Sequence, residues 1–142
     1  MGNRFRRRVF FTRVIRDDRG ANSGARRQSD AAADEAAREA PMIVCRHCGH
    51  PITRPEEALA VEGAQRHTFA NPHGIVFEIG CFRSAPGCAH AGAASDEFTW
   101  FSGYRWRVAV CGQCLLHLGW RFEAGQGDLF HGLILDRLVF PE

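Results

Sequence analysis

The sequence predicts a mostly β domain at residues 41–142, preceded by a flexible N-terminal extension at residues 1–40. Apolar and charged residues alternate in YRWRVAVC (104–111), and a period of two is typical of a half-buried strand. No stretch after residue 41 has the longer periodicity of an amphipathic helix. Two Cys-x-x-Cys pairs lie near the two ends of the domain, so a metal could fix one end to the other.

The extension differs from the rest of the chain in charge. Residues 1–40 hold ten Arg and six acidic residues, whereas residues 41–142 hold eight Arg and ten acidic residues. The net charge of +2 therefore comes from the extension, which has little apolar surface to bury. We expect a disordered segment or a start codon assigned too far upstream, with a basic arm that touches nucleic acid or membrane as the alternative.

The composition and the apolar runs indicate a compartment. No apolar run approaches the roughly 20 residues of a membrane span, and the N-terminus lacks the core of a signal peptide. We therefore expect a cytoplasmic protein without membrane contact. In that compartment, six cysteines suit metal ligands and free thiols better than disulfides.

The expected strands follow from runs of β-branched and aromatic residues. We expect a short strand before the first cysteine pair. We expect a loop at APGCAHAGAASDE (85–97), because this segment is rich in small residues with low β preference. FSGY (101–104) is an expected turn. Besides 104–111, the strands are expected at 42–45, 74–82, 119–124 and, with a turn inside, 128–140.

Four cysteines form the strongest motif. Two residues between thiols let the backbone turn so that both sulfurs reach one ion, and two such pairs complete the tetrahedron that zinc prefers. We predict one structural Zn²⁺, although 62 residues separate the pairs, and its ligands are Cys45, Cys48, Cys111 and Cys114. A redox-active or disulfide-bonded pair is the alternative.

Other cysteines and histidines are assigned lesser roles. His47 and His117 could replace a ligand, but four cysteines already complete the tetrahedron, so both are expected near the metal or at the surface. Cys81 and Cys88 are expected to be buried or loop thiols, with a second metal site as a weaker alternative.

Aromatic residues gather around the second cysteine pair. Seven of the fifteen aromatic residues lie between residues 98 and 122, among them all three tryptophans, Trp100, Trp106 and Trp120. Such a cluster is usually hydrophobic core. However, the three tryptophans come from three different segments, beside the predicted metal centre, and this arrangement could also enclose a ligand pocket.

Four motifs together resemble the thalidomide-binding (CULT) domain of the cereblon family: NPHG (71–74), EFTWFSGYRW (97–106), CGQC (111–114) and HLGWRF (117–122). The resemblance covers residues 41–138. It implies two antiparallel β-sheets that meet at an angle, pinned by one zinc ion. It also implies a stand-alone, bacterial-type, single-domain member that lacks the region with which the eukaryotic ubiquitin ligase binds its adaptor.

The resemblance also implies a ligand site for cyclic imides such as glutarimide. Trp100, Trp106 and Trp120 would form its walls, with Phe122 adjoining. The backbone of Phe98 and Trp100 would hydrogen-bond the imide, and Glu97 and Thr99 of the same segment would belong to the site. The rim and floor would come from Asn71, Pro72 and Phe77. The family has histidine in place of Phe98, which changes the chemistry of the rim.

We therefore expect a non-enzymatic binding module for cyclic-imide small molecules or for cyclic imides at protein C-termini. A zinc oxidoreductase like the peptide methionine-(R)-sulfoxide reductases is one alternative, but no cysteine follows Trp120 or Phe122. A reader of quaternary ammonium groups, assisted by Glu97, is another. The excess of acidic residues in 41–142 argues against a zinc ribbon that binds nucleic acid.

Overall fold

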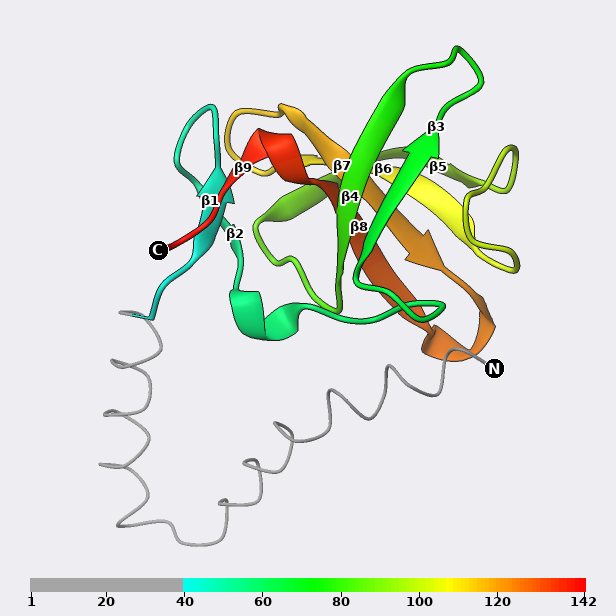
Figure 1. Ribbon diagram of the computed structural model, residues 1–142. Coiled ribbons are helices and arrows are strands. Elements are labelled where there is room, and N and C mark those ends of the chain that lie inside the picture. Colours follow the sequence, from blue (N-terminus) through cyan, green and yellow to red (C-terminus); the bar gives the residue numbers. More distant parts are fainter. Residues whose placement is uncertain (1–39) are drawn as a thin grey trace, which may run out of the picture.

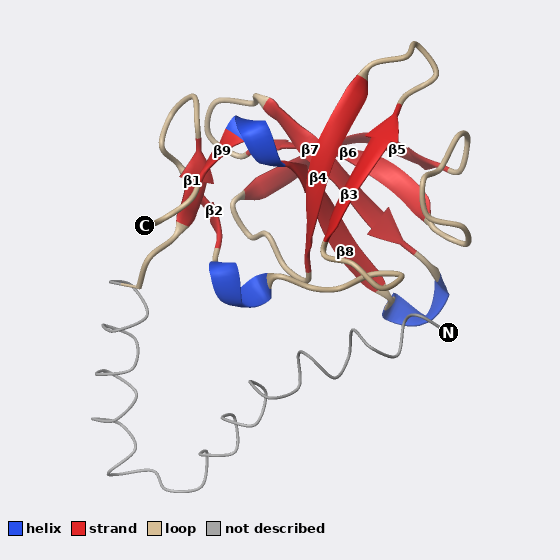
Figure 2. Cartoon of the chain, viewed as in Figure 1, coloured by secondary structure: helices blue, strands red, loops and turns tan. Residues whose placement is uncertain are grey.

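Two antiparallel β-sheets form the domain in the computed structural model, which describes residues 40–142 (Figure 1). The expected disorder of residues 1–40 falls almost entirely outside the described residues. The mostly β fold of two sheets that the sequence predicts is confirmed, and the helical segments within the described range are single 3₁₀ turns (Figure 2). None of these helical turns is long and apolar enough to cross a lipid bilayer.

The small sheet joins the first strands of the domain to the last. Its order is β2-β1-β9, with β1 at Ile43–Cys45, β2 at Pro51–Thr53 and β9 at Leu138–Val139. Both pairings of β1 are antiparallel. Figure 1 shows this sheet beside one end of the large sheet, so the two ends of the domain lie together.

The large sheet carries the rest of the strands in the order β3-β4-β8-β7-β6-β5. All neighbouring pairs are antiparallel. Its strands are β3 (Arg66–Ala70), β4 (Val76–Phe82), β5 (Cys88–Ser95), β6 (Arg105–Cys111), β7 (His117–Glu123) and β8 (Leu129–Ile134). The 3₁₀ turns are η2 (Pro55–Glu57), η3 (Gly125–Gly127) and η4 (Leu135–Arg137).

Two apolar clusters form the core. The first joins Ile43, Ile52 and Leu138 of the small sheet to Phe82 and Leu133 of the large one. The second is centred on buried phenylalanines that pack edge to face: Phe101 lies 4.9 Å from Phe122 and 5.1 Å from Phe130 between ring centroids. Successive side chains of a strand point to opposite faces. Residues of one strand such as β8 therefore contribute to both clusters.

One sequence-based expectation is wrong. Residues 85–97 are not all loop, because Cys88–Ser95 form the edge strand β5, which pairs with β6 from Cys88–Cys111 to Ser95–Trp106. Alanine and glycine have low intrinsic β preference, so the neighbouring strand imposes this conformation. A register shift between Ala91 and Ser95 accommodates the irregular segment.

The alternation in β6 also holds only in part. The alternation predicts one apolar face, with Tyr104, Trp106, Val108 and Val110, and one face with the two arginines. Ala109 and Cys111 lie on the arginine face and are nevertheless fully buried. Cys111 packs in the first apolar cluster with Ile43 and Leu138 of the small sheet, so the end of β6 is also covered on this face. The expected turn at 101–104 is present, and it is closed by the Tyr104 N–H to the Phe101 carbonyl at 3.0 Å.

Candidate functional site

The four predicted metal ligands lie together. Their sulfur atoms are all within 4.8 Å of one another, with Cys45 Sγ 3.7 Å from Cys114 Sγ and Cys48 Sγ 3.6 Å from Cys111 Sγ. A tetrahedral ion with metal–sulfur bonds of about 2.3 Å places its ligands roughly 3.8 Å apart. The four thiols therefore fit one tetrahedral metal ion, and all four are free cysteines.

Backbone groups favour the thiolate form of one ligand. The N–H groups of Gln113 and Cys114 point at Cys111 Sγ, at 3.4 and 3.5 Å. Burial raises the pKa of Cys111, but these hydrogen bonds and the neighbouring thiols lower it to about 7. A thiolate is the form that binds a metal ion. The site would fix the end of β1 to the end of β6.

The remaining candidates for metal binding lie outside this cluster. His47 is exposed, and Cys81 is fully buried in the second apolar cluster. Cys88 is partly buried on β5 opposite Cys111, and burial, with the nearby Cys111 and Cys45, raises its pKa to about 12. Neither spare thiol is set up as a reactive nucleophile.

A second feature is a cavity of about 450 Å³, called here the aromatic cavity. Its volume lies in the range of small-ligand pockets. It is lined by nine of the ten predicted ligand-site residues: Asn71, Pro72, Phe77, Glu97, Phe98, Trp100, Trp106, Trp120 and Phe122. Thr99 is the exception, since its hydroxyl instead donates a 3.4 Å hydrogen bond to the Phe101 carbonyl.

The tryptophans reach the cavity from three segments. Trp106 and Trp120 project from β6 and β7, and Trp100 comes from the loop between β5 and β6. Trp100 and Trp120 meet edge to face, with centroids 4.7 Å apart and planes at 73°. Phe77 of β4 packs edge to face on Trp120 at 5.3 Å. Trp100 and Trp120 are therefore each supported by another ring.

Two indole N–H groups tie loops to the cavity. Trp106 Nε1 donates to the Glu97 carbonyl at 2.8 Å, and Trp100 Nε1 donates to the Ala70 carbonyl at 3.2 Å. The first bond holds the segment that precedes Trp100, and the second joins this loop to the end of β3. The tryptophans thus position the backbone at the rim as well as forming the walls.

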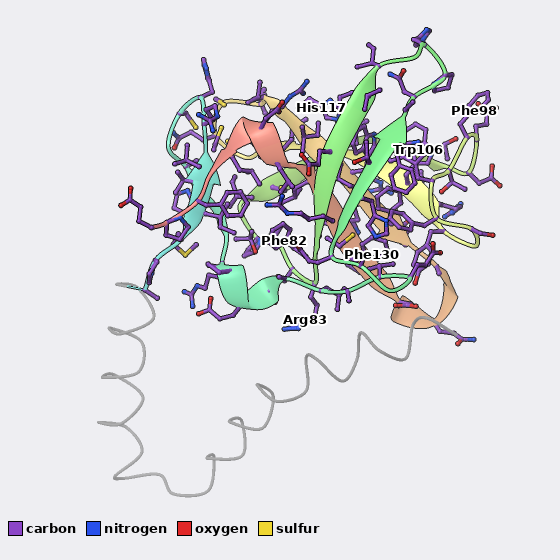
Figure 3. The ribbon with its side chains drawn as sticks, viewed as in Figure 1. Phe82, Arg83, Phe98, Trp106, His117 and Phe130 are labelled. Atoms are coloured by element: carbon purple, nitrogen blue, oxygen red, sulfur yellow. The ribbon has the colours of Figure 1, made fainter. Side chains whose placement is uncertain are left out.

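Phe98 adopts an unusual conformation at this rim. Its φ is +56°, in the left-handed region that side chains other than glycine seldom occupy. The residue is 73% exposed. Figure 3 shows Phe98 on a loop at the outer edge of the domain, away from His117. A residue in this backbone region costs about 1–3 kcal/mol and persists only where the surrounding structure enforces the conformation.

Sequence reasoning missed two lining residues, Val108 and His117. The alternation with Trp106 could have identified Val108. His117 could not be found in this way, because Ala109 pairs with Gly119 while Val110 pairs with His117, so Leu118 is an extra residue in β7. This bulge turns His117 to the face of Trp120, and their rings lie 4.9 Å apart.

The cavity is mainly apolar and carries few charges. His117 Nε2–H donates to the Gly119 carbonyl at 3.0 Å. Burial lowers the pKa of His117 despite this bond, and Arg137 lowers it further, so the ring is neutral at pH 7. Glu97 is the remaining ionisable residue of the lining. The cavity suits a compact, largely apolar ligand.

The fold and the two sites define a β domain with a four-cysteine cluster beside an aromatic cavity, and comparison with known proteins agrees with this class. No protein-family model matches the chain. Proteins named cereblon do match. The one from Xenopus tropicalis is 36% identical over 90 residues, which cover 61% of this chain and 20% of the relative. The one from Drosophila persimilis is 30% identical over 104 residues, or 68% of this chain and 17% of the relative.

The cereblon of Drosophila melanogaster is 29% identical over 92 residues, or 62% of this chain and 16% of the relative. These matches support a cereblon-like domain in the chain. The chain spans about a fifth of the length of the Xenopus relative and about a sixth of the length of the Drosophila ones.

Proposed function

We propose that the aromatic cavity binds a neutral cyclic imide, either a small molecule or an imide ring at a protein C-terminus. The observation that carries this proposal is the convergence of three tryptophans on a cavity of about 450 Å³ whose rim is backbone held by two indole N–H bonds. The chain would act as a binding module, without catalysis.

The chemistry of an imide matches these surfaces. A glutarimide is a compact ring with apolar methylene edges and one edge of carbonyl, N–H and carbonyl. Indole faces can bury the methylenes, and the backbone at Phe98 can offer an acceptor and donors to the polar edge. Tryptophan has only two side-chain torsions, and the rings of Trp100 and Trp120 are already packed against other rings. Ligand binding would therefore cost little side-chain entropy.

The metal would be structural zinc. Four thiolates saturate a tetrahedral ion and leave no position for substrate, which is typical of structural sites. The ion would hold β1 against β6, and β6 carries Trp106 into the cavity. Zinc would therefore fix the frame on which the cavity is built.

The placement of thiols favours binding over sulfoxide reduction. A reductase of the methionine-sulfoxide type needs a nucleophilic cysteine at its pocket. Cys81 lies in the apolar core and Cys88 lies beside the cysteine cluster, and neither lines the cavity. We expect no turnover of a methionine-(R)-sulfoxide substrate with a dithiol reductant.

A quaternary ammonium ligand is the second candidate, because Glu97 lines the cavity next to the tryptophan faces. Titration of intrinsic tryptophan fluorescence separates the two. We expect quenching by thalidomide, and none by its N-methylated imide, which lacks the N–H donor and would leave a backbone acceptor unpaired. If only a trimethyllysine peptide quenched the fluorescence, the ligand of the cavity would be a quaternary ammonium group and not an imide. No response to any of the three would contradict a role of the aromatic cavity in binding either ligand class.

A further inference from the structure

The opposite face of the large sheet carries an unusual row of basic side chains. In the pairing of β6, β7 and β8, Arg107 lies opposite Arg121, and Arg121 lies opposite His131. Cross-strand partners share one face, and this face is the reverse of the one that carries Trp106 and Trp120. Like charges directly opposite each other destabilise a sheet unless something compensates them.

The acidic neighbours compensate only part of this charge. Glu123 lies 3.5 Å from Arg121 Nε and 3.9 Å from Arg105, and the described residues give Arg107 no ion pair. His90 of β5 completes the group, with its Nε2 3.1 Å from His131 Nε2. Three arginines face one carboxylate, so two positive charges remain while both histidines are neutral.

Both histidines stay neutral for physical reasons. Burial lowers the pKa of His90, as do Arg121 and Arg107, while Glu123 opposes them. Burial, His90 and Arg121 lower the pKa of His131 to about 3. At neutral pH the pair shares one hydrogen bond, and each imidazole keeps a donor or an acceptor for another partner.

Several polar atoms in this row lack a hydrogen bond, although Arg121 Nε lies in the 3.5 Å ion pair with Glu123. Arg107 Nε, Arg121 Nε and His131 Nδ1 are buried without a hydrogen bond in the described part of the chain, and His131 is only 5% exposed. Buried donors without partners are rare in native proteins and cost stability. Their presence among guanidinium groups whose charge a single carboxylate compensates only in part points to an anionic partner.

We propose that Arg107 and Arg121, with His90 and His131 beside them, form a site for a phosphate-type dianion, distinct from the aromatic cavity. Guanidinium groups bind phosphate oxygens through paired, charge-assisted hydrogen bonds. A phosphate group carries close to two negative charges above pH 7, which balances the two excess positive charges, whereas one carboxylate would balance only one. Inorganic phosphate and a phosphoryl ester share this chemistry.

Histidine ring resonances in an NMR titration at pH 7.5 test the site. Inorganic phosphate is added at constant ionic strength against chloride, followed by O-phosphoserine and acetate. We expect saturable shifts of the His90 and His131 signals with phosphate, while the signals of exposed His47 stay fixed. A stronger response to phosphoserine identifies an ester as the source, and an equal or weaker one identifies free phosphate.

Arg107→Gln should raise the apparent Kd for phosphate at least about tenfold, since it removes a charge-assisted contact. It should fold normally in chloride, because it relieves the repulsion from Arg121. Arg121→Gln provides a second variant if the first does not fold. Arg66→Gln is the matched control, because Arg66 lies on β3 with a side chain 63% exposed. An equal response to acetate or chloride, or unchanged affinity in the folded Arg107 or Arg121 variants, overturns the proposal.

Discussion

Replacement of Trp106 by alanine tests how the aromatic cavity works. Trp106 contributes a wall of the cavity, and its indole N–H holds the Glu97 carbonyl at 2.8 Å. The alanine variant loses both, so the rim segment from Glu97 to Trp100 also loses its tether. We expect Trp106→Ala to nearly abolish imide binding while the cysteine cluster stays intact, because Trp106 belongs to the other cluster of the core.

The magnitude follows from these two contributions. Truncation of a buried aromatic anchor costs about 2–4 kcal/mol of binding free energy, which corresponds to a Kd higher by about 30- to 1000-fold. Trp106→Phe keeps an aromatic face but loses the hydrogen bond, at a cost of about 0.5–1.5 kcal/mol, or roughly two- to twelvefold in Kd. Comparison of the two variants thus separates the contribution of the aromatic face from that of the hydrogen bond to the Glu97 carbonyl.

Isothermal titration with glutarimide measures these affinities, and metal content with the melting temperature controls for folding. A folded Trp106→Ala protein whose Kd stays within about threefold of the wild type would refute the reasoning. If Trp106→Phe lost as much affinity as the alanine variant, the hydrogen bond to Glu97 would be the main contribution of this residue.

Three further changes test the frame around the cavity. Cys114→Ser should lose the metal and cooperative folding, because metal binding is coupled to folding. The control variant Cys88→Ala should keep one zinc per chain in elemental analysis. A Cys114→Ser protein that folds without metal would contradict this prediction. Gly119→Ala should lower the free energy of unfolding by about 2–4 kcal/mol, because Gly119 has a φ of +154° and an added Cβ would collide with the Gly132 carbonyl. Gly125 has open space around it, so Gly125→Ala should have the melting temperature of the wild type. The pKa of His131 is about 3 in the folded protein, so between pH 6.5 and about 3 only the unfolded state binds a proton at this residue. The contribution of His131 to the free energy of unfolding is therefore complete above pH 6.5 and decreases below it, by about 2 kcal/mol at pH 5. His131→Leu should lose less stability than the wild type between pH 7.5 and pH 5 in urea unfolding, and an equal loss would assign the effect to other groups.

The cysteine cluster and most of the cavity were predictable because their signals are local. The Cys-x-x-Cys spacing of Cys45 with Cys48 and of Cys111 with Cys114 limits each pair to one turn, and two such pairs are typical of a metal site. Alternation placed Trp106 on a strand face, and the resemblance to cereblon supplied the rim residues Asn71 and Pro72. The structure brings these segments together around one cavity.

The parts that sequence missed depend on pairing between strands. Strand β5 has little β preference of its own and exists because β6 offers a partner. The side of β7 on which His117 lies depends on a bulge in the pairing of β7 with β6, which the sequence of β7 alone does not reveal. The row of Arg107, Arg121 and His131 likewise becomes visible only in the register of three strands.

Contacts between ligand and tryptophan protons test the central claim most directly. Glutarimide is added to the isotope-labelled protein, and nuclear Overhauser effects are recorded between its methylene protons and the indole rings. The account predicts effects to Trp100, Trp106 and Trp120 together, with a shifted Phe98 amide signal. Saturable binding of glutarimide without any effect to these three rings, or no binding at millimolar ligand, would contradict it.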